Sequence, residues 1–81
     1  WKVVDDDKLA AEALGLARHL ATQPTKGLAL IKQALHQSAG NTVAEQLAAE
    51  ADLQRQAGTT QDYREGVAAF LGKRPARFTG Q

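Results

Sequence analysis

Few residues of this sequence have types and a spacing suited to chemistry, and the pair that stands out is Phe70 and Lys73. On a helix of about 100° per residue their side chains project about 60° apart, close to Gly66. An aromatic ring and an ammonium group at this spacing suit a flat anionic ligand that stacks and carries a phosphate. Plain helix packing is the simpler interpretation, with Phe70 in a core, Gly66 at a close approach and Lys73 a solvated cation. Residue types alone favour packing and leave the ligand site open.

Other residues that catalysis would need occur without partners. Ser38 is the single serine and lacks the motif of a nucleophile elbow. His19 and His36 fall on different predicted helices without metal-ligand spacing. Glu50 is a possible general base, but no neighbouring residue in the pattern would tune its pKa. We therefore expect no catalytic residue, no metal and no cofactor in this chain.

Composition limits the partners. The chain has 81 residues, no cysteine and a net charge of +1. No apolar run approaches the roughly 18 residues of a membrane span, so we expect no membrane partner. A basic end formed by Lys73, Arg74 and Arg77 suggests nucleic-acid binding as a weak idea, but the near-neutral total charge argues against it.

Hydrophobic periodicity predicts an all-α chain of about four amphipathic helices with short loops. Thr42 followed by Glu45 fits a capping box, and Thr59 or Thr60 is a suitable N-cap for the last helix. On the third helix we expect Val43, Leu47 and Ala51 to form the packing face. The predicted helices span residues 7–21, 25–37, 42–57 and a final stretch that starts at 62 and runs into a basic tail ending near 78.

We expect a single domain over residues 1–81, with residues 1–6 as a residual strand or linker stub. Trp1 to Val4 alternates and is β-prone, yet a single strand has no partner in a helical chain. This suggests that the N-terminal part of a larger protein precedes it.

The final stretch resembles the C-terminal signature of the enoyl-CoA hydratase/isomerase (crotonase) superfamily. The matching residues are Asp62-x-x-Glu65-Gly66-x-x-Ala69-Phe70-x-x-Lys73-Arg74-x-x-x-Phe78. Trp1-x-Val3-Val4-Asp5, Pro24-Thr25 and Lys32-Gln33-Ala34-Leu35 resemble earlier segments of the same proteins, in the same order. Residues 17–25, 30–34 and 62–67 are most similar to the branch of the family that isomerises ring-1,2-epoxyphenylacetyl-CoA in phenylacetate degradation.

The resemblance implies a division of labour in a cytoplasmic enzyme that acts on CoA thioesters. A catalytic spiral core would hold the acyl-CoA pocket and the oxyanion hole, and this chain would be its inactive C-terminal helical region. The implied partners are that N-terminal core and further copies of the protein, as a trimer or hexamer. By motif position, Phe70 would contact the adenine of CoA and Lys73 the ribose phosphate. Gly72 departs from the family pattern, and we expect it to fray the helix end and loosen Lys73.

An interpretation from a different class stays open. Four amphipathic stripes and an alanine-rich third helix also suit a free-standing helical domain that binds another protein. Such a domain would work without a catalytic core.

Overall fold

The computed structural model describes all 81 residues and contains four helices and no strand. The helices are α1 Asp6–Ala21, α2 Thr25–Ser38, α3 Val43–Gly58 and α4 Gln61–Leu71. The all-α prediction is therefore confirmed, and most helix ends lie within a residue of the expected positions. Residues 1–5 form neither helix nor strand, so the stretch that looked like a strand end is irregular here, where no second strand is present to pair with it.

Local capping chemistry explains where the later helices begin. At the start of α3 the Thr42 hydroxyl accepts a hydrogen bond from the Glu45 N–H at 3.3 Å, and the Glu45 carboxylate accepts one from the Thr42 N–H at 2.7 Å. This is the predicted capping box. Thr60, rather than Thr59, caps α4, because its hydroxyl accepts from the Tyr63 N–H at 3.0 Å.

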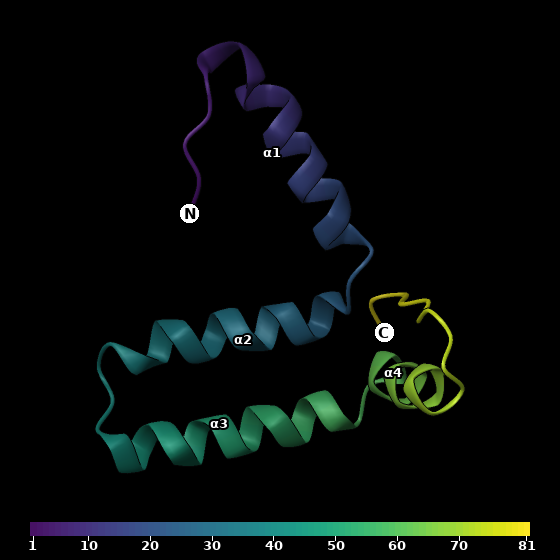
Figure 1. Cartoon of the computed structure of the whole chain (residues 1–81). Helices are drawn as coiled ribbons and strands as arrows, with labels where there is room; N and C mark the ends of the chain where they lie inside the picture. Colours follow the sequence, from purple (N-terminus) through teal and green to yellow (C-terminus); the bar gives the residue numbers. More distant parts are fainter.

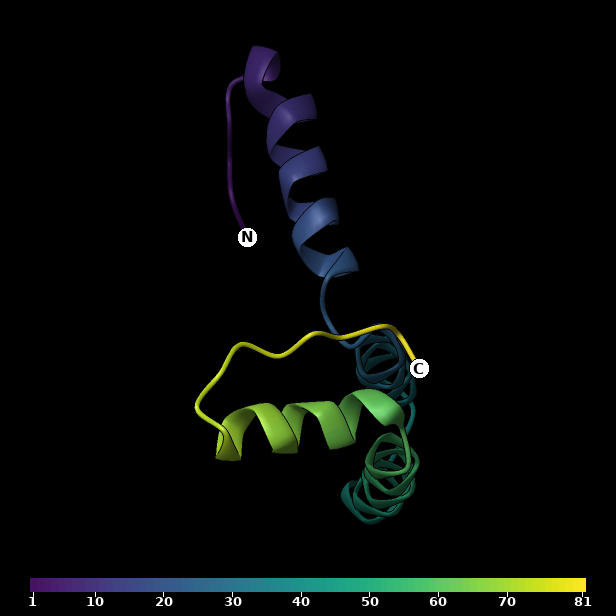
Figure 2. The same cartoon turned by 90° about the vertical axis from the view of Figure 1, so that its right-hand side faces the viewer.

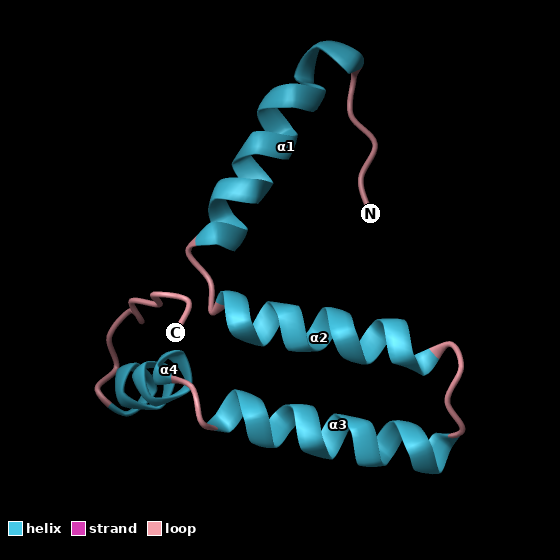
Figure 3. Ribbon diagram, turned by 180° about the vertical axis from the view of Figure 1, so that it is seen from behind, coloured by secondary structure: helices cyan, strands magenta, loops and turns pink.

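The helices form a hairpin with two additions. α2 and α3 lie side by side and antiparallel (Figures 1 and 3), and α4 crosses the open end of this hairpin. The tail that follows α4 turns back and runs along it, as the view in Figure 2 shows. α1 projects away from the other helices, and residues 1–5 run back beside it, tied by an ion pair of 2.6 Å between Lys2 and Glu12.

Only Leu53, Ala69 and Asp62 are buried. On α3 the expected packing face is wrong, because Val43 and Leu47 are 79% and 64% exposed. The side of α3 that is shielded is a different one, and it holds Gln46, Ala49, Leu53 and Ala57. The sequence of α3 carries two stripes rich in small residues, and contact with α2 determines which of them is covered.

The chain exposes more surface than a compact domain of its size. Its accessible area is 6598 Å², about 1,900 Å² above the value expected for a folded protein of 8.7 kDa. Its radius of gyration is 16.0 Å, against about 12 Å for a compact chain of this length. Exposed leucines on α1, together with Ile31 and Leu35 on α2, account for part of this excess area. None of the helices combines the length and apolar character that crossing a membrane requires.

Candidate functional site

Two carboxylates on α4 hold the C-terminal tail, and we call this arrangement the tail clasp: Asp62 and Glu65 with tail residues 72–81. Asp62 is buried, and its carboxylate accepts hydrogen bonds from the backbone N–H groups of Thr79 at 2.8 Å and Gly80 at 2.7 Å. The N–H of Asp62 in turn donates to the carbonyl oxygen of Gln81 at 2.7 Å. The last residues of the tail are therefore fixed against the first turn of α4.

Glu65, one turn further along α4, holds the first part of the tail, at Arg74 and Arg77. Its carboxylate accepts two hydrogen bonds from the Arg74 guanidinium, at 2.7 and 3.0 Å. It also accepts one from the backbone N–H of Arg77 at 2.8 Å. The bonds from Arg74, and then that from Arg77, lower the pKa of Glu65 from 4.5 to about 2. Glu65 is thus the charged anchor of the clasp at neutral pH.

The tail is expected to come free in acid. Because the pKa of Glu65 is lower in the folded chain than in the unfolded one, its contribution to stability is complete above pH 4.5 and is lost as the pH falls through about 2. Amide exchange at Arg77, corrected for intrinsic rates, should show protection at pH 5 that disappears toward pH 2. In a Glu65→Gln variant this pH dependence should vanish; an unchanged profile would contradict the assignment.

The end of α4 departs from the expected geometry. The helix stops at Leu71, and Lys73 lies beyond it with φ of 50°, so the helical-wheel relation between Phe70 and Lys73 does not apply. The N–H of Lys73 donates to the Phe70 carbonyl at 3.2 Å, and the N–H of Arg74 to the Ala69 carbonyl at 3.0 Å. This is a Schellman closure with a lysine where glycine is usual. The closure is hydrogen-bonded, so Gly72 does not fray the helix end as expected.

Replacing Lys73 with glycine should stabilise this turn. A residue other than glycine in the left-handed region costs about 1–2 kcal/mol, and glycine avoids most of that cost. In Lys73→Gly we expect a gain of about 1 kcal/mol, measured as roughly fivefold slower exchange of the Arg74 amide. The same change at Lys32, inside α2, should instead cost about 1 kcal/mol. Faster exchange at Arg74 in the Lys73 variant would refute the strain argument.

Phe70 is 82% exposed, so the interpretation that places it in a core is wrong for this chain. It stands at the edge of an apolar groove of about 410 Å³ between α4, the start of α2 and the tail. Gly66 lies in this groove, where an added Cβ would be 3.6 Å from the Phe78 ring. The chain's own tail thus passes Gly66 at an ordinary van der Waals distance, and within this chain no close approach requires a glycine there. The groove is lined by Pro24, Gly27, Ala57, Thr60, Asp62, Tyr63, Gly66, Val67, Phe70, Leu71 and Phe78.

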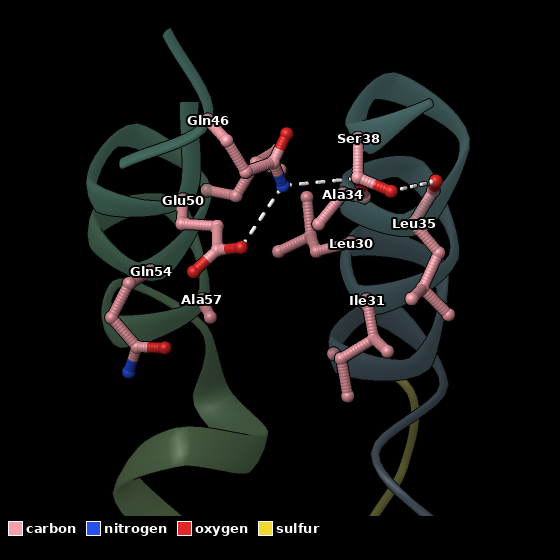
Figure 4. A pocket seen from close by; sticks show the side chains of 11 residues that line it. Leu30, Ile31, Ala34, Leu35, Ser38, Gln46, Glu50, Gln54 and Ala57 are labelled. Carbon is pink, nitrogen blue, oxygen red and sulfur yellow. Dashed lines mark hydrogen bonds between the residues drawn. The ribbon is translucent and has the colours of Figure 1, made fainter. Parts of the chain in front are cut away.

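A second groove, also of about 410 Å³, lies between α2 and α3, away from Phe70 and Lys73 (Figure 4). The Gln46 amide donates to the Ala34 carbonyl at 3.2 Å and to the Glu50 carboxylate at 2.9 Å. The side chains of Gln46 and Glu50 thus bond one another, and six of the 11 residues that line this groove are hydrophobic. This arrangement suits packing against another surface better than catalysis.

Sequence reasoning missed the roles of Asp62 and Glu65. In the sequence both residues stand out only as members of the C-terminal signature, with no role assigned to either. The available signal was two acids one turn apart on α4, followed by a basic tail long enough to fold back onto them. The clasp therefore explains Asp62, Glu65 and Arg74 of the signature, while Phe70 and the Lys73 side chain take no part in its hydrogen bonds.

Comparison with known proteins identifies the family of this chain. A family model described as "Enoyl-CoA hydratase/isomerase" matches residues 1–81. The chain belongs to the enoyl-CoA hydratase/isomerase family. The resemblance inferred from the signature is therefore confirmed.

Individual relatives give the same result within this family. The chain is 60% identical over all 81 residues to the 1,2-epoxyphenylacetyl-CoA isomerase of Escherichia coli, covering 31% of that protein. It is 43% identical over its whole length to a probable enoyl-CoA hydratase of Rhodobacter capsulatus, covering 32% of it. A crystal structure of an enoyl-CoA hydratase from Geobacillus kaustophilus superposes with a TM-score of 0.93 at 26% identity, over 98% of this chain and 30% of that one. The chain thus spans about a third of the length of the relatives it matches.

Proposed function

We propose that this chain is the C-terminal helical region of a cytoplasmic enzyme that isomerises a CoA thioester, with the epoxide of phenylacetyl-CoA as substrate in phenylacetate degradation. The observation that carries the proposal is the 60% identity, over every residue of the chain, to a 1,2-epoxyphenylacetyl-CoA isomerase. In this proposal the region closes over a catalytic part located elsewhere in the protein. The chain itself is inactive in this proposal: Glu45 caps α3, and Asp62 and Glu65 anchor the tail.

Within this region, Phe70 and Lys73 form the proposed contact with the nucleotide end of the CoA thioester. Phe70 offers a ring that is 82% exposed, and stacking on a base contributes about 1–3 kcal/mol. Lys73 follows it at the end of α4 and takes part in none of the chain's ion pairs, so its ammonium is available for a phosphate. In this role the pair binds the substrate and does not touch the reacting atoms.

The test compares two substrates on the whole protein that carries this chain. Phe70→Ala and Lys73→Ala should each raise KM for the epoxyphenylacetyl-CoA thioester about tenfold and leave kcat within about twofold. The matching pantetheine thioester, which has no nucleotide, should show no change. Arg18→Ala on α1 is a control far along the chain from this pair. Equal effects on both thioesters would refute the nucleotide contact, and absence of isomerase turnover in the unmodified protein would refute the reaction.

The exposed helix faces support a proposal about assembly. An excess of about 1,900 Å² is more than one partner buries in a standard protein interface, which is about 800 Å². We infer that these faces are shared between the protein's own catalytic part and neighbouring subunits in a trimer or hexamer. Light scattering on the whole protein tests this inference, and a monomer at micromolar concentration would contradict it. A stable, isolated 81-residue species that binds an unrelated protein would favour the interaction-domain alternative instead.

A further inference from the structure

The turn that carries Lys73 is closed by backbone hydrogen bonds and tied to α4 by one ion pair. The N–H of Lys73 bonds to the Phe70 carbonyl on one side, and the N–H of Arg74 bonds to the Ala69 carbonyl on the other. Beyond that point the Arg74 side chain returns to α4 and makes two bonds to Glu65. The backbone is therefore fixed at Lys73 and at Arg74, and this fixes the direction in which the Lys73 side chain leaves the end of α4.

Lysine does not favour this backbone conformation by itself. With φ of 50°, Lys73 is the only residue other than glycine with a positive φ in the chain. Such conformations persist where the surroundings determine them, and they gather at functional sites. The two backbone bonds of the Schellman closure hold this conformation. Glu65 reinforces it, because it binds the chain directly after Lys73, at Arg74, and again four residues beyond it, at Arg77.

The charges at the C-terminal end of α4 also suit a contact between Lys73 and a phosphate. Glu65 lies on the final helix and would repel a phosphate if its charge were free. Arg74 neutralises it in a two-bond pair, whereas Lys73 has no acidic partner. The pair thus ties the tail to α4 without adding a net charge, and the Lys73 side chain, three residues after Phe70, is in no ion pair.

We propose that Glu65 and Arg74 are positioning residues whose ion pair holds the left-handed turn and so sets where the Lys73 ammonium stands relative to Phe70. This inference rests on the proposed contact of Phe70 and Lys73 with the nucleotide end of a CoA thioester. It adds that substrate affinity depends on residues that do not touch the substrate. It also gives a specific purpose to the acid and the arginine of the C-terminal signature.

The test is the kinetics of Glu65→Gln in the whole protein. Positioning predicts that KM for the CoA thioester rises about fivefold, that kcat stays within about twofold, and that the pantetheine thioester is unaffected. Charge alone predicts the opposite sign, because removing an acid near a phosphate should lower KM. Arg74→Lys keeps the positive charge but cannot make both bonds to Glu65, so it should give a similar rise that charge does not explain. It provides a second measurement if the first variant folds poorly. Asp52→Asn, which removes an exposed acid from an arginine pair on α3, should change nothing.

A double-mutant cycle decides whether the effect passes through Lys73. In a Lys73→Ala background, Glu65→Gln should raise KM no further, because the group being positioned is gone. A full additional rise in that background, or no rise in the single variant, would overturn the positioning role. If Lys73→Ala alone leaves KM for the CoA thioester unchanged, the proposed nucleotide contact fails first. The two failures are therefore distinguishable.

Discussion

Replacing Asp62 with alanine is expected to release the end of the tail at a cost of about 3 kcal/mol. Hydrogen bonds to a charged group contribute about 1.5–3 kcal/mol each, and Asp62 accepts two from backbone N–H groups while it is buried. Water can reach part of the freed tail, so the cost stays near the lower end of the sum. The amides of Thr79 and Gly80 should exchange about 100-fold faster, since each 1.4 kcal/mol is a factor of ten.

A matched control separates this effect from the loss of any acid. Asp52 is also a helical aspartate, but it is exposed and binds only Arg55 and Gln56 on its own helix. Exposed pairs of this kind contribute about 0–1 kcal/mol, so Asp52→Ala should leave exchange in the tail unchanged. Protection of Thr79 and Gly80 that survives in Asp62→Ala would show that the buried carboxylate does not hold the tail.

Gly80→Ala is expected to lower the free energy of unfolding by about 2 kcal/mol, because a strained backbone conformation and a steric contact add together. Gly80 has φ of +79°, a region in which a residue with a Cβ costs about 1–2 kcal/mol. The added Cβ would also stand 2.7 Å from the Thr25 hydroxyl at the start of α2. Denaturant unfolding of the whole protein, with exchange at Gly80 as a local readout, measures the loss.

The same substitution at Gly66 provides the control, because the expected sign is reversed. There an added Cβ meets the Phe78 ring at an ordinary 3.6 Å, and alanine favours a helix by about 1 kcal/mol over glycine. Adding Thr25→Ala to Gly80→Ala should restore only the part of the loss that comes from the hydroxyl contact. A neutral Gly80→Ala would mean that the tail does not approach α2 as the structure describes.

The positions of the helices were predictable because their signals are local. Pro24 before α2, the Thr42–Glu45 capping box and Thr60 act within one turn of the residues they affect. The buried face of α3 was not predictable in this way. Both Val43 and Leu53 lie on helical stripes, and only contact with another helix decides which of them is covered.

The candidate site was predictable in part for a related reason. Phe70 and Lys73 are close in sequence, and their residue types, an aromatic ring and an ammonium group, indicate a binding site for a flat anionic ligand. The bonds of Asp62 join residues 17 and 18 positions apart and end on backbone amides, which carry no mark in a sequence. The left-handed conformation of Lys73 belongs to a Schellman closure with lysine where glycine is usual, so neither periodicity nor composition could indicate it.

The scarcity of buried side chains has a calorimetric consequence. A globular domain of 81 residues would show a heat-capacity increase on unfolding of about 1 kcal/mol/K, most of it from apolar surface that becomes hydrated. Here only Leu53 and Ala69 are apolar and buried, so the segment by itself should show a much smaller increase and a broad thermal transition. When its exposed helix faces are covered by a partner, the missing heat capacity should appear in the association step, as a negative change on binding.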